Sequence, residues 1–383
     1  ATGTVPADRH LWDKLPSGTL REVTLSSEQQ IAMDYYNAAC AVGNAEEHLR
    51  VVRRLSIVGT PGAGKTELFV QFVGAAIRKG HRILILCPTG QLVASYRERL
   101  PEADNVRIDT IHAGLAIYRE KESLVEHAPP SLLRHYDAIL VDECSQLDND
   151  VARKLIYAME ELPQLPFIAV AADYQQLQPV GSRGVMLSWC HRLKTIELTT
   201  CYGSSDPELL SFLHHCRVEQ PSRETLSAFF QDRRYAGSRY DDSSLSKAVS
   251  DGLELQRRTG HAFMWLCVTN NGVARLSVIA LSLSGLSLDA AKDGFPMDPN
   301  AGECELFRAA AGVRVRMTRN LDKERGYVNG ATGRVVSILR KHGESPIVFT
   351  VLLDTGTMIV VHPIWQSGRC FLPCTYGYAT TIR

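Results

Sequence analysis

A glycine-rich loop enclosed by an expected strand and an expected helix limits what this chain can fold into more than any other feature. The apolar run 55–58 leads into residues 59–66, which read GTPGAGKT, and an amphipathic stretch follows over 65–79. Glycines let successive backbone N–H groups turn inward, and the N-terminus of the following helix adds a partial positive charge. The pattern therefore predicts a phosphate-binding loop at the carboxyl end of a strand.

Short apolar runs alternate with longer amphipathic stretches through the first half of the chain. The expected strands are 55–58, 83–87, 138–141 and 167–171, and the expected helices are 65–79, 91–100 and 151–162. This alternation is typical of parallel strands joined by crossover helices. We predict an α/β fold with a doubly wound parallel sheet, whose ligand lies at the carboxyl ends of the strands.

The pattern changes after about residue 196. A helical stretch near 207–216 and a polar region over 219–246 precede a new strand at 263–268. Residues 313–363 alternate apolar and polar positions and carry turn signals at Asn329-Gly330 and Thr355-Gly356, which predicts mostly antiparallel β structure. We expect an N-terminal leader at 1–24 and a first domain at 25–195. The second domain is expected in two segments, 196–331 and 369–383, with a small β insertion at 332–368 between them.

Composition narrows the class of protein. No run approaches the roughly 20 apolar residues of a membrane span, and the N-terminal residues lack the apolar stretch of a signal peptide. The ten cysteines form no CxxC pair, which favours reduced thiols in a reducing compartment. Two groups containing cysteine lack a second ligand pair at the spacing of a zinc site, namely His214, His215 and Cys216, and Cys370 with Cys374. We expect a soluble intracellular protein, nuclear or mitochondrial in a eukaryote and cytoplasmic in a bacterium or phage.

The charge balance is informative only locally. Lys and Arg together equal Asp and Glu at 42 each, so the net charge carries no nucleic-acid signal. Residues 314–344 hold eight Lys and Arg against three Asp and Glu. This excess is compatible with a nucleic-acid contact and equally with a solvated strand face.

A pair of acids ends the expected strand 138–141. Parallel strands bring their carboxyl ends to one edge of the sheet, so Asp142 and Glu143 are expected beside the glycine loop. We assign Thr66 and Asp142 to Mg²⁺, and Lys65 to the β and γ phosphates of ATP. Glu143 is the candidate that polarises the attacking water.

The surroundings of these two motifs resemble superfamily 1 helicases of the 5′-to-3′ group, which includes the RecD, Dda and PIF-type enzymes. DECSQ at 142–146 looks like helicase motif II, and ADYQQLQPV at 172–180 looks like motif III. Further similar segments are LSSEQ at 25–29 (the Q motif), 87–90 and 109–112 (motifs Ia and Ib), 266–270 (a strand of the second motor domain) and YVNGATG at 327–333. The resemblance implies two RecA-like domains, a small β-rich insertion in the second, and ATP-dependent movement on single-stranded DNA, with RNA also possible.

The resemblance also implies roles for single residues. The residues that contact ATP would be Gln29 at the adenine and the loop residues Gly59, Thr60, Pro61, Gly62, Ala63, Gly64, Lys65 and Thr66. Gln176 would sense the γ-phosphate and act with the catalytic Lys65, Asp142 and Glu143. The nucleic-acid contacts would be Thr89, Gly90, Thr110, His112, Thr269 and Asn329. A helix cap is an equally good explanation for a threonine at a strand end. Stacking candidates are Tyr174, Trp265 and Tyr378.

The sequence departs from the family pattern at two places. LTTCYG at 198–203 fits motif IV until its last position, where Gly203 replaces an arginine that reaches the γ-phosphate, and Arg217 looks like a poor substitute. Residues 376–383 look like the approach to motif V, and motifs V and VI are not in this sequence, so we expect a piece of a longer protein. These departures leave open a hydrolysis-impaired nucleic-acid-binding module. An unrelated P-loop ATPase would have no use for the motif III and 327–333 segments.

Overall fold

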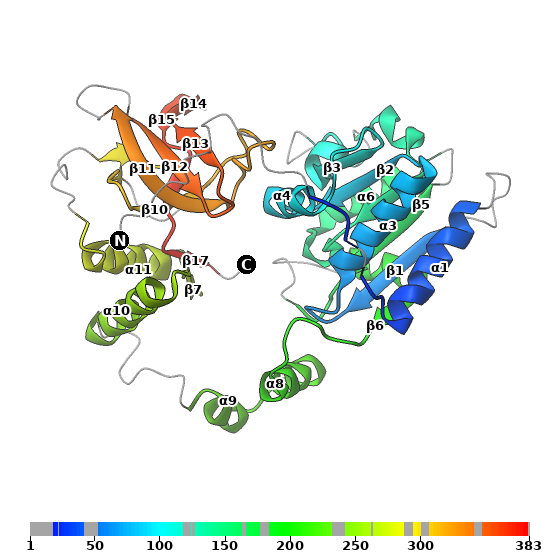
Figure 1. The fold of residues 1–383 in the computed structure, drawn as a ribbon, viewed down its shortest axis with the longest axis horizontal. Coiled ribbons are helices and arrows are strands. Elements are labelled where there is room, and N and C mark those ends of the chain that lie inside the picture. Colours follow the sequence, from blue (N-terminus) through cyan, green and yellow to red (C-terminus); the bar gives the residue numbers. More distant parts are fainter. Residues whose placement is uncertain are drawn as a thin grey trace. The chain divides into compact units, whose positions relative to one another are not determined.

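The computed structural model describes most of the chain and divides it into two compact units, one within residues 16–229 and the other within 230–383 (Figure 1). The described residues are 18–21, 23–41, 53–117, 124, 127–162, 166–176, 184–231, 242–261, 263–286, 294–299, 306–340 and 347–381. None of the helices in these ranges is long and apolar enough to cross a membrane.

A six-stranded parallel sheet forms the centre of the first unit. Its strands lie in the order β3-β2-β4-β5-β1-β6. They are β1 (Arg54–Gly59), β2 (Ile83–Cys87), β3 (Val106–Thr110), β4 (Ala138–Val141), β5 (Phe167–Ala172) and β6 (Lys194–Leu198). The predicted α/β class is confirmed, and four of these strands match the apolar runs of the sequence. Strands β3 and β6 escaped prediction because both lie at sheet edges and are only partly buried.

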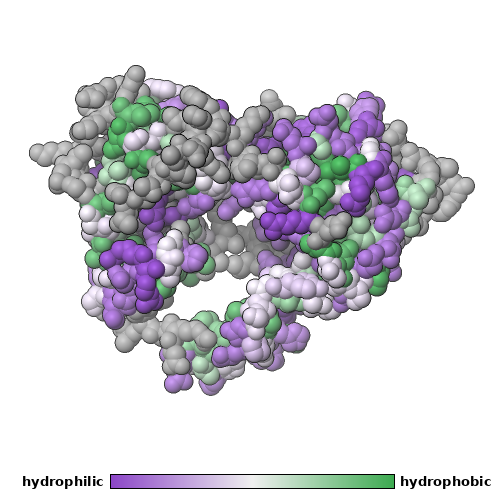
Figure 2. All heavy atoms as spheres, in the orientation of Figure 1, coloured by the Kyte–Doolittle hydropathy of each residue, from purple (hydrophilic) through white to green (hydrophobic). Residues whose placement is uncertain are grey.

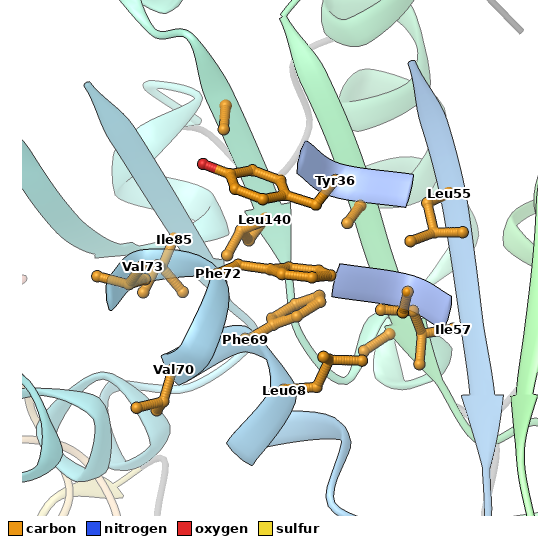
Figure 3. Close-up of a cluster of buried hydrophobic side chains, with 14 of the residues drawn as sticks. Tyr36, Leu55, Ile57, Leu68, Phe69, Val70, Phe72, Val73, Ile85 and Leu140 are labelled. Atoms are coloured by element: carbon orange, nitrogen blue, oxygen red, sulfur yellow. The ribbon is translucent and has the colours of Figure 1, made fainter. Parts of the chain in front are cut away.

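Helices cover both faces of this sheet. The helices that pack on it are α1 (Ser27–Ala41), α3 (Lys65–Lys79), α4 (Gly90–Arg99), α5 (Ile111–Gly114), α6 (Asn149–Glu160) and α7 (Val185–Cys190), with short 3-10 turns η1 (Ser131–His135) and η2 (Cys144–Gln146). Two further helices, α8 (Pro207–Val218) and α9 (Arg223–Phe229), contain no buried residue and lead away from the sheet (Figure 1). One core lies under α1 and α3, where the Tyr36 and Phe72 rings stack at 4.9 Å (Figure 3). A second core lies under α6 and α7. Because β1 and α3 are both anchored in the first core, the loop between them has a fixed position.

The first unit extends further along the chain than the sequence-based boundary at residue 195. Strand β6 pairs with β1 from Lys194 to Leu198, so that boundary falls inside a strand of the first sheet. Helices α8 and α9 also belong to this unit. The alternating burial of β6 hid it, because only Ile196 and Leu198 point into the core.

In the described residues of the second unit lie two helices, a short parallel strand pair and a mainly antiparallel β region. The helices are α10 (Asp242–Thr259) and α11 (Asn270–Leu283), and β7 (Trp265–Cys267) pairs in parallel with β17 (Ala379–Thr381). Polar side chains cover α10 in the view of Figure 2, and Val249 is its one buried residue.

A five-stranded antiparallel sheet lies in the order β13-β12-β11-β10-β16. Its strands are β10 (Arg314–Met317), β11 (Thr332–Arg340), β12 (Val348–Leu353), β13 (Met358–Val361) and β16 (Cys374–Tyr376), and the smaller strands are β8 (Phe295–Pro296), β9 (Leu306–Phe307), β14 (Ile364–Gln366) and β15 (Arg369–Phe371). The predicted antiparallel character is confirmed. The sheet is wider than the expected insertion at 332–368, because β10 and β16 pair with each other outside those limits.

Three arginines of the basic stretch that begins at Arg314 are held by other side chains of the second unit. Arg314 is buried and its guanidinium lies 2.7 Å from the carboxylate of Asp354, while Arg319 lies 2.7 Å from Asp298. Arg316 donates a hydrogen bond to the Thr380 hydroxyl. These arginines therefore stabilise the β region, and the local excess of charge is not by itself a nucleic-acid surface.

Candidate nucleotide site and nucleic-acid contacts

The glycine loop has the backbone needed to surround phosphates. Gly62 and Gly64 have φ angles of 78° and 83°, in the left-handed region that costs glycine nothing, and Gly64 caps the N-terminus of α3. Lys65 is buried and its ammonium donates to the carbonyls of Gly59 at 2.9 Å and Thr60 at 3.1 Å. The cation is thereby held over the loop, at the end of a helix dipole that also attracts anions.

Asp142 meets the loop from the end of β4. Its fully buried carboxylate accepts hydrogen bonds from the Thr66 hydroxyl at 3.0 Å and the Tyr96 hydroxyl at 2.6 Å. Burial and the neighbouring Asp142 raise the pKa of Tyr96, so this phenol stays a donor. The structure thus brings Thr66 and Asp142 together across 76 positions of sequence, and it adds Tyr96, which no sequence pattern indicated.

Glu143 has an unusual backbone conformation and a carboxyl oxygen without a partner. Its backbone has a φ of 49°, in the left-handed region that non-glycine residues rarely adopt. Its Oε2 is buried and finds no hydrogen-bond partner among the described residues, and burial followed by repulsion from Asp142 raises the pKa of the carboxyl group. Strain and an unsatisfied carboxylate are typical of groups kept for chemistry rather than for stability.

These oxygens suit a hard divalent cation. The Thr66 hydroxyl and the Asp142 carboxylate already converge, and Mg²⁺ prefers one or two protein oxygens together with phosphate oxygens and water. The hydroxyl oxygen of Thr60 is also buried without a hydrogen-bond partner in the described part of the chain. The residues present therefore fit a nucleotide triphosphate with magnesium.

The Gln29 side chain contacts the backbone of the phosphate loop. The Ser26 hydroxyl accepts a hydrogen bond from the Gln29 backbone N–H, and the Gln29 side-chain oxygen accepts one from the Ser26 N–H, a capping box that begins α1. The side-chain nitrogen of Gln29 lies 3.4 Å from the carbonyl of Gly64. Both ends of this buried amide are engaged within the protein, so contact with adenine remains a prediction.

The motif IV segment lies against the phosphate loop. The N–H of Tyr202 donates to the carbonyl of Gly62 at 2.8 Å, and the Cys201 thiol lies 3.4 Å from the carbonyl of Pro61. A Cβ atom at Gly62 would lie 2.8 Å from the Cα of Gly203. The glycine that replaces the family arginine therefore stands at the loop itself, and the exposed ring of Tyr202 beside it was missed by the sequence reasoning.

Motif III and α8 meet at a buried carboxylate. Asp173 follows β5, and its Oδ2 accepts from the Gln176 side chain at 3.2 Å and from the Arg217 guanidinium at 2.8 Å. Arg217 also lines a cavity of about 240 Å³ that reaches Gly59 at the start of the loop. Arg217 therefore lies closer to the phosphate loop than its distance along the chain suggested, although the sequence had made it a poor substitute for the missing arginine. Leu177, Gln178, Pro179 and Val180 lie outside the described residues.

Three of the predicted nucleic-acid contacts are helix caps. The hydroxyls of Thr89, Thr110 and Thr269 accept from backbone N–H groups at the starts of α4, α5 and α11 respectively. Gly90 is buried as the first residue of α4, whereas His112 on α5 is exposed. Because β2 and β3 are adjacent, the α4 and α5 caps lie at neighbouring strand ends. Asn329 is exposed in the turn before β11.

The aromatic residues predicted to stack on bases differ in how far the structure exposes them. Tyr378 was a wrong choice, because its ring is only 3% exposed in the core of the second unit. Tyr174 is half-buried and its hydroxyl donates to the Cys190 thiol at 3.0 Å, and Trp265 is also half-buried. Trp365, which the sequence reasoning passed over, is 77% exposed.

Comparison with known proteins agrees with this geometry. A family profile described as an AAA domain matches residues 45–182. The chain is 24% identical over 230 residues to ATP-dependent DNA helicase PIF1 of Danio rerio, covering 54% of this chain and 33% of the relative. It is 23% identical over 354 residues to the Xenopus laevis PIF1, covering 86% of this chain and 49% of the relative. The chain thus spans less than half the length of each of these relatives.

Solved structures share the fold. A Bacteroides Pif1 bound to ssDNA has a TM-score of 0.57 at 17% identity, over 94% of this chain and 83% of that one. The Pif1 helicase of Candida albicans has a TM-score of 0.56 at 15% identity, over 94% of this chain and 86% of that one. These matches show that the chain has the fold of the solved Pif1 helicases and is similar in sequence to ATP-dependent DNA helicases of the PIF1 type.

Proposed function

We propose that this chain is the core of an ATP-dependent DNA helicase or translocase, which binds single-stranded DNA and moves 5′ to 3′ as it hydrolyses ATP. The observation that carries the proposal is the convergence of Thr66 and Asp142, 3.0 Å apart, beside a loop whose lysine is buried over its carbonyls. The names of the relatives, ATP-dependent DNA helicases, support the DNA substrate, and the direction of movement rests on the resemblance of the motifs to the 5′-to-3′ group.

ATP binding uses groups that the first unit already presents. The loop N–H groups and Lys65 hold the β and γ phosphates, and Lys65 exchanges its carbonyl partners for phosphate oxygens. The exposed ring of Tyr202 lies beside the loop, where it covers the adenine face while Gln29 anchors the loop from the other side.

Hydrolysis needs a base for the attacking water. Glu143 serves as that base, because its carboxylate is half-buried, its Oε2 has no hydrogen-bond partner among the described residues, and it lies beside Asp142 at the carboxyl end of β4. Thr66 and Asp142 would hold Mg²⁺, which when bound would neutralise part of the phosphate charge. Gln176 senses the γ-phosphate, and Asp173 holds both Gln176 and Arg217 in place.

Strand binding uses helix N-termini. The first turns of α4 and α5 lie at adjoining strand ends, and the N–H groups of a first helical turn, which have no partner within the helix, can bind phosphates without reading sequence. Thr89 and Thr110 keep these termini ordered, and exposed His112 adds a donor. Thr269 at α11 and Asn329 provide the corresponding contacts from the second unit.

A hydrolysis-impaired binding module is the second candidate, and Gly203 is the observation that favours it. An arginine that reaches the γ-phosphate is worth about 10³ or more in rate, and this position carries no side chain. The intact Lys65, Asp142 and Glu143 oppose this candidate.

ATP turnover measured with and without single-stranded DNA separates the two. The helicase proposal predicts that single-stranded DNA stimulates ATP turnover.

Lys65→Ala should abolish turnover while single-strand affinity is retained, and Gly203→Arg should raise turnover severalfold or more. An unstimulated wild-type chain that still binds DNA would support the binding module. Equal loss of turnover and DNA binding in Lys65→Ala would count against separate nucleotide and strand sites.

A further inference from the structure

Helix α4 carries a buried tyrosine that reaches the acid pair. Tyr96 is fully buried, and its hydroxyl donates to Oδ2 of Asp142 at 2.6 Å. The Thr66 hydroxyl donates to the same oxygen at 3.0 Å, and the backbone N–H of Glu143 donates to Oδ1 at 2.8 Å. Donors at both oxygens hold the carboxylate in one orientation. Of these three donors, Tyr96 alone comes from α4.

The Tyr96 hydroxyl supports a group that suits Mg²⁺. Asp142 and Thr66 converge beside the phosphate loop, and both are assigned to the cation. A donor that hydrogen-bonds a metal-binding carboxylate fixes the orientation of that carboxylate, and losing such a donor typically costs about 10- to 100-fold in metal affinity or activity. Tyr96 is thus placed to act on the nucleotide site through Asp142.

The same helix begins at a predicted strand contact. Thr89 caps α4, and Gly90 is the first residue of the helix. Tyr96 lies about two turns further along, at about 3.6 residues per turn. Near the other end of α4, Arg99 forms an ion pair at 2.6 Å with Glu67 in the first turn of α3. Because a short helix is a rigid element, a displacement at its start also displaces the Tyr96 hydroxyl.

We propose that Tyr96 is a positioning residue that couples strand binding at the start of α4 to Asp142, and thereby to the site for the nucleotide and Mg²⁺. The proposal rests on the proposed function for the strand and the nucleotide. Such coupling is reciprocal: the factor by which the strand changes nucleotide affinity equals the factor by which the nucleotide changes strand affinity. Tyr96 contributes to that factor through one hydroxyl group, which a single substitution removes.

Nucleotide affinity with and without the metal tests the positioning. Tyr96→Phe keeps the buried ring and removes only the hydroxyl. Its affinity for a fluorescent, non-hydrolysable ATP analogue should be about tenfold weaker than wild type in Mg²⁺ and unchanged in EDTA. A general loss of structure would weaken both. Tyr36→Phe removes another buried hydroxyl of the same unit, away from the acid pair, and should change neither value. Equal affinities of wild type and Tyr96→Phe in Mg²⁺ would overturn the positioning role.

Strand affinity with and without the nucleotide tests the coupling. A labelled dT oligonucleotide is titrated in the absence and presence of Mg²⁺ and the ATP analogue, and the ratio of the two affinities measures the coupling. Tyr96→Phe should bring this ratio close to one and leave the nucleotide-free strand affinity as in wild type. Arg99→Gln removes the other link from α4 and should keep most of the ratio, because a partly exposed ion pair contributes little.

Two results would overturn the coupling. They are a wild-type ratio of one, and a Tyr96→Phe ratio equal to that of wild type. Failure of the proposed function is distinct from both, because the wild-type chain would then bind neither the strand nor the nucleotide.

Discussion

Glu143 shows how a single residue is kept out of its preferred state. A carboxyl group whose pKa is raised in the folded protein is more easily deprotonated in the unfolded chain. Its ionisation therefore opposes folding above the folded-state pKa, and the penalty disappears below the ordinary glutamate value, where both states are protonated. The left-handed backbone of this residue adds strain that does not depend on pH.

Replacing Glu143 with glutamine should therefore separate stability from activity. Glu143→Gln is expected to abolish turnover and to raise the unfolding free energy of the nucleotide-free chain by about 0.5–2 kcal/mol at neutral pH. The gain should shrink as the pH falls through the folded-state pKa toward the ordinary glutamate range. Denaturant unfolding at several pH values measures this, and a gain that does not vary with pH would contradict the assignment.

Arg217 acts on the nucleotide site through another residue. It donates to buried Asp173, whose carboxylate also holds Gln176. We expect Arg217→Ala to lower kcat by about 10- to 100-fold, because a displaced Gln176 no longer meets the γ-phosphate, while KM for ATP changes little. Arg217→Lys preserves one charged contact and should recover much of that rate. Parallel losses in kcat and ATP affinity would instead indicate a general loss of structure.

At the scale of elements, hydrogen bonds of Gln29 connect the start of α1 to the phosphate loop. Gln29 closes the capping box with its oxygen and holds Gly64 with its nitrogen. A Cβ on Gly64 would lie 2.5 Å from that nitrogen, so a side chain there would displace the Gln29 amide from the loop, and the positive φ of Gly64 favours glycine independently.

Two substitutions distinguish the cap from the loop contact. Ser26→Ala removes the hydroxyl cap and should cost about 1 kcal/mol of stability with ATP affinity nearly unchanged. Gln29→Glu keeps the oxygen that caps α1 and replaces the donor with a group that repels the Gly64 carbonyl, so it should weaken ATP binding severalfold more than Ser26→Ala does. Thermal unfolding and nucleotide titration of both variants measure the difference, and equal ATP affinities would refute a role for Gln29 in holding the loop.

At the scale of the whole molecule, the two units have separate hydrophobic cores. Separate cores predict two unfolding transitions by calorimetry. The nucleotide residues of the loop and the acid pair all belong to the first unit, so Mg²⁺ with a non-hydrolysable ATP analogue should raise one transition. At 100 times the dissociation constant the gain is about 2.7 kcal/mol. Lys65→Ala is the matched control, and an equal shift of both transitions would show that the units unfold together.

Much of the first unit could be predicted because its signals are local. The runs at 83–87 and 138–141 are continuous apolar strands, and the helix at 65–79 begins at the lysine of the loop and ends where Gly80 adopts a left-handed conformation. Strand β6 could not be recognised, since half of its side chains face solvent. The threonines at strand ends cap helices, but a cap and a nucleic-acid contact use the same residue type at the same place, so the sequence could not choose between them.

The sequence by itself determined the phosphate loop, the acid pair at a strand end and the class of sheet that carries them, because each depends on neighbouring residues and on the period of apolar positions. Only the tertiary structure decided that Tyr96 bonds to Asp142, that Arg217 reaches Asp173, that Gly203 stands against Gly62 and that Trp365 is left in water. The three contacts join residues far apart in the chain, and the exposure of Trp365 depends on what packs around it. They depend on which strands are adjacent and which faces are covered, and no local pattern encodes that geometry.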